Sequence, residues 1–234
     1  MDSKSCVIKW GGLSLIVFAL LTATLSILQA IWFSYPLPYE GAMRHHIPIV
    51  FFQNEALRAV MTLGCVIPLI LIPGIIGLER YLRDEDNHHC LLIARYFALI
   101  AVIAWCISEM VWPSINWFVS HTKVFDSTDV VIMLINGINA FFHVYIGEYL
   151  RLLCLAIWIL AVSRLAYKNR SLPIWLCIIG IILAVIMMLV LVGRWLLFSP
   201  YLIEHTIDFL PVVDFWIFLV GGIVMMKYYE PKTS

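Results

Sequence analysis

Three charged residues lie at similar depth inside apolar segments of this sequence, where a charge can bind a ligand or carry a proton. They are Glu109, Arg151 and Asp214, and each is 13 or 14 residues from a Lys or Arg near the end of its own segment. At a helical rise of about 1.5 Å per residue, all three would lie roughly 20 Å from those basic residues. An unpaired charge costs several kcal/mol at that depth, so we expect the three side chains to face each other.

The segment that contains Arg151 carries the densest set of polar residues. At 100° per residue, Asn139, His143 and Gly147 share one helical face with Arg151. Glu148 lies three residues before Arg151, where the two side chains can pair. We therefore predict a charged floor in the outer half of the protein, made of Glu109, Glu148, Arg151 and Asp214.

Further polar residues stand near the outer ends of other segments, namely Glu55, Arg58, Arg194 and Asp208. Together with the charged floor, they predict a polar cavity that opens outward and binds a small ligand. The floor holds three acids against one Arg, so we expect one carboxyl group to be protonated at neutral pH, as proton-coupled transport requires. Two alternatives stay open: ion pairs that only lock helices together, and arginines that only extend to the interface.

Catalytic and metal-binding interpretations have weaker support. Ser108 beside Glu109, with His143 on another helix, can be drawn as a hydrolase site, but nothing in the spacing requires it. The run from Asp84 to Cys90 mixes ligand types on adjacent residues, which rarely close a metal tetrahedron. We predict no metal site and no cofactor, and expect a noncatalytic protein more than an enzyme.

Six apolar segments must position these residues. They cover residues 11–33, 56–78, 91–112, 141–163, 172–198 and 209–226. About 20 apolar residues are needed to cross a bilayer as a helix, and 63% of this chain is hydrophobic. We therefore predict an all-α fold, a single domain over residues 1–234 built as a polytopic bundle of six transmembrane helices.

The second segment contains two prolines and several glycines. Pro68, Pro73, Gly64, Gly74 and Gly77 should kink or locally unwind this helix. We expect neighbouring helices to satisfy the carbonyl groups that such a break frees.

The distribution of Lys and Arg predicts that both termini are cytoplasmic. Of the 15 such residues, ten fall on one side, four on the other, and Arg151 lies inside a segment. The ten are Lys4, Lys9, Arg80, Arg83, Arg95, Arg164, Lys168, Arg170, Lys227 and Lys232, and the four are Arg44, Arg58, Lys123 and Arg194. Because basic residues favour the cytoplasmic side, we predict an N-in, C-in, multi-pass protein of a bacterial inner membrane.

The order of elements resembles that of a known family. A basic loop runs from Lys168 into Leu172-Pro173-Ile174-Trp175-Leu176, and the last segment begins with Leu210-Pro211 and ends at Lys227. This arrangement is similar to a bacterial six-span family known only as domain of unknown function 4386. The resemblance implies a six-span membrane fold and no particular reaction.

These observations predict an integral membrane protein that binds or translocates a small polar or amphipathic ligand or a proton. The alternatives are an intramembrane enzyme that acts on lipid and a structural or assembly subunit. Expected partners are the lipid bilayer and a small-molecule ligand, and the zero formal net charge gives no reason to expect nucleic acid. The oligomeric state stays open.

Overall fold

The computed structural model describes residues 3–33, 62–84, 87–122, 137–138, 140–197 and 210–229. These residues form helices and short connections and contain no strand, so the predicted all-α fold is confirmed. The elements are α1 (Ser3–Phe33), η1 (Ile67–Ile70), α4 (Leu71–Leu82), α5 (His88–Thr122), η3 (Ala140–Leu150), α7 (Arg151–Lys168), α8 (Ile174–Leu197) and α10 (Leu210–Tyr229).

Five helical stretches of the described chain are long and apolar enough to cross a membrane. They are Ser5–Leu28, Thr62–Leu82, His88–Val111, Tyr145–Lys168 and Ile174–Gly193. The sixth helix, α10, occupies the position predicted for the sixth span. Large apolar side chains such as Leu63, Leu189 and Phe215 are at least 60% exposed, which suits a surface that faces lipid tails.

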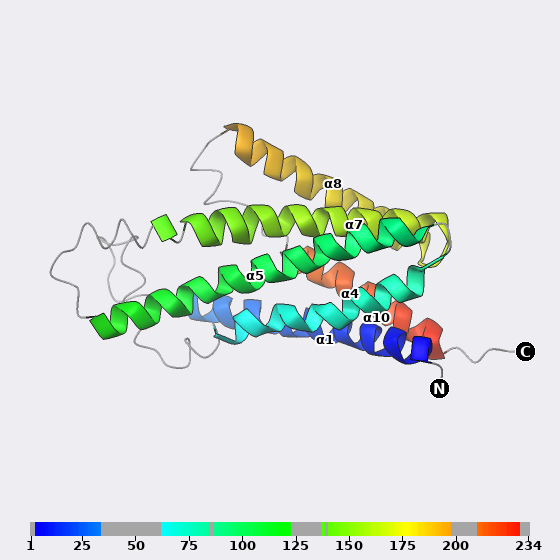
Figure 1. Cartoon of the computed structure of the whole chain (residues 1–234), viewed down its shortest axis with the longest axis horizontal. Helices are drawn as coiled ribbons and strands as arrows, with labels where there is room; N and C mark the ends of the chain where they lie inside the picture. The colour runs from blue at the N-terminus through cyan, green and yellow to red at the C-terminus, as the bar shows by residue number, and fades with distance from the viewer. Residues whose placement is uncertain are drawn as a thin grey trace, which may run out of the picture.

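The helices form two groups of three that run along the long axis of the bundle (Figure 1). In the first helix group, α1 packs against α4 on one side and α10 on the other. In the second helix group, α7 packs against α5 and α8. The start of α1 and the end of α10 lie at the same end of the bundle as the α7–α8 connection, and we call it the terminal end. This arrangement suits two termini on one side of a membrane, and the cytoplasmic orientation stays a prediction.

Glycines bring α1 very close to both of its neighbours. A Cβ atom placed on Gly11 would lie 2.5 Å from Gly77 Cα of α4, so these two backbones are in direct contact. On the opposite side, a Cβ atom on Gly221 of α10 would lie 3.0 Å from the Gly12 carbonyl oxygen. Small residues allow such close approach between membrane helices, where dispersion replaces the hydrophobic effect as the main attraction. The first helix group is therefore held together backbone to backbone.

The predicted break in the second span is confirmed. Residues 62–66 are helical, the chain then tightens into η1 at Pro68, and the α-helix resumes at Leu71. At the end of η1, the Ile70 carbonyl accepts a hydrogen bond from Ser14 Oγ of α1. This hydrogen bond links α1 to the chain at the break.

Helix α7 ends in a motif that ties three helices together. Ser171 N–H donates to the Ala166 carbonyl at 3.1 Å and Arg170 N–H to the Tyr167 carbonyl at 3.3 Å, the pattern of a Schellman motif. Arg170 has a φ of 50°, in the left-handed region that glycine usually occupies there. The Ser171 carbonyl accepts hydrogen bonds from the Tyr81 hydroxyl at 2.9 Å and from Lys227 Nζ.

Candidate functional site

Arg151 is a buried cation in the middle of a membrane-like bundle. It is the first residue of α7, and only 7% of its surface is exposed. Its guanidinium carbon lies 4.8 Å from the ring centroid of Trp105 on α5. The negative face of an indole attracts a cation, and the attraction strengthens when both groups are removed from water. Trp105 therefore helps to offset the cost of burying this charge.

A close contact one turn away sets the distance between α5 and the helix that leads into α7. Gly147 lies directly against Ser108, whose Oγ occupies the space where a side chain of residue 147 would stand. Ser108 is 1% exposed. Because Trp105 and Ser108 are three residues apart on α5, they share a face. Gly147 and Arg151 both contact this face.

Glu109 lies next to this face and is oriented toward the second span. A Cβ atom placed on Gly64 would lie 3.4 Å from Glu109 Oε2, so the carboxylate contacts the helical residues 62–66. The absent side chain of Gly64 leaves room for the carboxylate. Glu109 is half-buried, whereas Arg151 is fully buried.

Asp214 of α10 is buried, with 4% of its surface exposed. Its depth follows from neighbouring contacts, because Gly221 lies against Leu15. Asp214 lies seven residues from Gly221 along α10, in the direction away from the terminal end. Phe18 lies three residues from Leu15 along α1, in the same direction. At about 1.5 Å per residue, Asp214 lies about 6 Å beyond Phe18. The Phe18 ring is 5.5 Å from the Trp105 ring, so Asp214 is at the level of the Arg151–Trp105 pair to within about one helical turn.

That Glu109, Glu148, Arg151 and Asp214 form one charged floor stays a prediction. Arg151 and Asp214 are both buried and at similar depth, and Glu109 lies one turn farther along α5. His143, Glu148 and Arg194 belong to described helices, but their side chains are outside the described part of the structure. Glu55, Arg58, Asn139 and Asp208 lie outside the described residues altogether.

The predicted helical face of span four needs a correction. Residues Ala140–Leu150 form a π-helix, in which hydrogen bonds join residues five apart instead of four. The 100° rotation used to align Asn139, His143 and Gly147 with Arg151 does not apply to this segment. Gly147 and Arg151 nevertheless both contact α5, Gly147 at Ser108 and Arg151 at Trp105.

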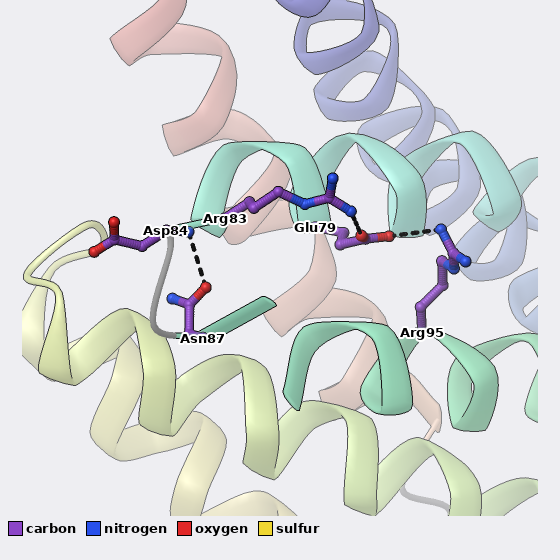
Figure 2. A network of polar contacts seen from close by, with 5 residues as sticks. All are labelled: Glu79, Arg83, Asp84, Asn87 and Arg95. Atoms are coloured by element: carbon purple, nitrogen blue, oxygen red, sulfur yellow. Dashed lines mark hydrogen bonds and ion pairs between the residues drawn. The ribbon is translucent and has the colours of Figure 1, made fainter. Parts of the chain in front are cut away.

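Sequence reasoning missed one buried acid, Glu79 of α4, which is 4% exposed. Its carboxylate accepts hydrogen bonds from Arg83 one turn later and from Arg95 Nη1 of α5 at 3.0 Å (Figure 2). The side chains of Arg83 and Arg95 are 33% and 27% exposed, so both are partly buried against this acid. The available signal was the spacing of Glu79 and Arg83, four residues apart on a helix.

Asp84 and Asn87, from the run considered above as a ligand set, are hydrogen-bonded to each other just before α5 begins. Asp84 N–H donates to Asn87 Oδ1 at 2.8 Å (Figure 2). Asn87 Nδ2 donates to the Leu82 carbonyl at 3.1 Å. Helix α5 begins at the next residue, His88. Within the described ranges there is no group of three His, Cys, Asp or Glu residues that could hold a metal ion.

Comparison with known proteins adds a family to this geometry. Comparisons with curated proteins and with solved structures find no match. The model of the family described as domain of unknown function (DUF4386) matches residues 11–226, which include all of the residues discussed above as a site. A match over most of the 234 residues shows that this chain is a member of the DUF4386 family.

Proposed function

We propose that this protein binds or translocates a small polar or amphipathic ligand or a proton through the outer half of its helix bundle. The observation that carries the proposal is the buried Arg151 over Trp105, with the buried Asp214 at a depth that agrees to within about one helical turn. We also place the protein in a bacterial inner membrane, on the basis of its apolar helices and its Lys and Arg distribution.

The cost of burying charge at the depth of Arg151 and Asp214 favours a functional role over a role that only holds helices together. A charged side chain at membrane depth costs several kcal/mol, and residues of this kind commonly mark substrate or proton pathways. Glu79 provides the internal comparison, because it is a buried acid with two Arg partners at the terminal end. Glu79 has the geometry expected of a contact between helix ends, whereas Arg151 lies within the apolar span Tyr145–Lys168 and Asp214 within the apolar helix α10, each 13 residues from a basic residue near the terminal end.

The alternative of a lipid hydrolase has less support from the geometry. Its nucleophile would be Ser108, which is 1% exposed and has Gly147 against its Oγ. A nucleophile needs space beside its oxygen for the reacting carbonyl or phosphoryl group. Gly147 occupies that space, so we propose a carrier and not an enzyme.

Proton flux into liposomes tests this proposal. The purified chain is reconstituted with a pH-sensitive dye inside the vesicles, and an inward proton gradient is applied. We expect flux above that of empty vesicles, and we expect Asp214→Asn and Arg151→Met each to reduce it at least tenfold. Asp84→Asn is the matched control, because Asp84 is an exposed acid at the terminal end, and its flux should equal that of the wild type.

Native mass spectrometry of the same preparation tests whether the protein binds a ligand other than the proton. We expect a small polar or amphipathic molecule to copurify with the wild type and to be lost from Arg151→Met. A wild-type protein with neither proton flux nor a bound molecule would refute the proposal. So would variants at both positions that retain wild-type flux or ligand.

A further inference from the structure

Polar contacts between the two helix groups gather at the terminal end of the bundle. Arg95 of α5 binds Glu79 of α4, as described above. The Tyr81 hydroxyl of α4 and Lys227 Nζ of α10 both donate to the Ser171 carbonyl of the α7–α8 connection. Each contact joins a residue of the first helix group to a residue of the second.

The Ser171 carbonyl can receive both donors because of how α7 ends. Ser171 uses its own N–H in the Schellman motif, and it lies beyond the last residue of the helix. Carbonyl groups there have no partner within the helix and need one from elsewhere. Helices α4 and α10 of the first helix group supply two such partners, the Tyr81 hydroxyl and Lys227 Nζ.

A fourth contact lies in the first turn of α8. Trp216 Nε1 of α10 donates to the Leu176 carbonyl at 3.1 Å. Gly180 stands one turn after Leu176, and a Cβ atom there would lie 2.8 Å from Trp216 Nε1. The absent side chain of Gly180 therefore gives the indole access to the carbonyl.

The ion pair between the groups can separate without leaving a buried charge alone. If Arg95 moves away, Glu79 keeps Arg83, which belongs to the same helix group. Arg95 in turn keeps the ring of Tyr96 on its own helix, 5.4 Å from its guanidinium carbon, and its side chain is already 27% exposed. A pair that serves only stability loses several kcal/mol when one partner leaves, and here each partner has a second partner within its own group.

Contacts within the first helix group include close-packed backbones besides the hydrogen bond from Ser14 to the Ile70 carbonyl. Gly11 and Gly77 hold α1 and α4 in backbone contact, and Gly12 and Gly221 do the same for α1 and α10. Close-packed backbones resist separation, whereas side-chain hydrogen bonds near a bundle end can exchange for bonds to water. Motion is therefore easier between the groups than within the first group.

We propose that the contacts Glu79–Arg95, Tyr81–Ser171, Lys227–Ser171 and Trp216–Leu176 form a terminal latch, and that the two helix groups separate at the terminal end when this latch breaks. The latch itself follows from the contacts. Its role as a gate, which would give the charged floor access to the terminal side, rests on the proposed function.

Distance measurement by pulsed electron paramagnetic resonance tests the latch. Spin labels are placed at Arg164→Cys of α7 and Met226→Cys of α10, because both residues are exposed and belong to different groups. Cys6 and Cys90 are first replaced by Ser, since they are the two cysteines that are not buried. The full chain is studied in lipid nanodiscs without a gradient and without added ligand.

We expect one dominant short distance in this labelled protein and a longer second distance when the latch is weakened. Tyr81→Phe removes one hydrogen bond and should raise the ratio of long to short distance about fivefold. Tyr81→Phe combined with Lys227→Met should raise the ratio further. Tyr167→Phe combined with Lys168→Met is the matched control, because it removes the same groups from exposed positions within α7 and should leave the ratio unchanged.

Unchanged distances in both latch variants would overturn the proposal and make these contacts purely structural. If the double variant does not fold, Tyr81→Phe decides alone, because it removes a single oxygen atom. The measurement is independent of transport. A shift in distance without any proton flux or bound ligand would support the latch and refute the proposed function. Proton flux without a shift in distance would support the proposed function and refute the latch.

Discussion

The backbone contact between Gly11 and Gly77 makes a sharp prediction about stability. Gly11→Ala adds one methyl group that would lie 2.5 Å from Gly77 Cα and 3.0 Å from the Pro73 carbonyl oxygen. Ordinary van der Waals contact begins at 3.4 Å, so α1 and α4 would have to separate by about 0.9 Å, the difference between 3.4 and 2.5 Å. The obstructing atoms are backbone atoms, which cannot rotate away as a side chain can.

The expected free-energy change combines two opposing terms. Overpacking of a well-packed interface costs about 1–3 kcal/mol. Replacing Gly by Ala within a helix returns up to about 1 kcal/mol through helix propensity. We therefore expect Gly11→Ala to lower the free energy of unfolding by about 1–2 kcal/mol, or the apparent melting temperature by about 2–8 °C for a chain of this size.

Thermal unfolding of the purified protein in detergent, followed by tryptophan fluorescence, measures this change. Gly222→Ala of α10 is the matched control, since a Cβ atom at that position would meet no atom within 4 Å. The control should melt at or above the wild-type temperature. Equal melting temperatures for Gly11→Ala and Gly222→Ala would show that the two helices are not in backbone contact.

Three further outcomes follow from the structure. Arg170→Gly should raise the apparent melting temperature, because Gly relieves about 1 kcal/mol of left-handed backbone strain at φ 50°, and a lower temperature would contradict the Schellman geometry. Ser14→Ala should cost about 1 kcal/mol in unfolding free energy by removing the donor to the Ile70 carbonyl, whereas Thr24→Ala, which loses a bond within its own helix, should cost less. A reporter fused after Ser234 should be active only in its cytoplasmic form, and periplasmic activity would rule out the N-in, C-in orientation.

Much of the fold could be predicted because the information is local. A long apolar run specifies a spanning helix through its own composition, and five of the six predicted segments overlap helices long and apolar enough to cross a membrane. The break at Pro68 was also predictable, since proline lacks an N–H wherever it lies. The extension of α5 to Thr122, ten residues beyond the predicted end at 112, was not.

The site was harder to predict because it depends on which helices meet. Helical rise was enough to place Arg151 and Asp214 at similar depth, but nothing in the sequence indicated that Trp105 would lie under the guanidinium. Glu79 was missed because its interhelical partner, Arg95, is 16 residues away along the chain on the next helix. The π-helix at Ala140–Leu150 was missed because the alignment of polar residues used the 100° rotation per residue of an α-helix.

The position of α1 between α4 and α10 has a consequence for biosynthesis. Helix α1 contacts α10 through Gly12 and Gly221, which are 209 residues apart in sequence, so α1 leaves the ribosome long before this partner. During translation, α1 and α4 can pair early through Gly11 and Gly77, but the other side of α1 stays uncovered until α10 is inserted. Until then, lipid or an insertion factor must cover the surface around Leu15, and a chain truncated before Leu210 keeps that surface exposed to quality-control proteases.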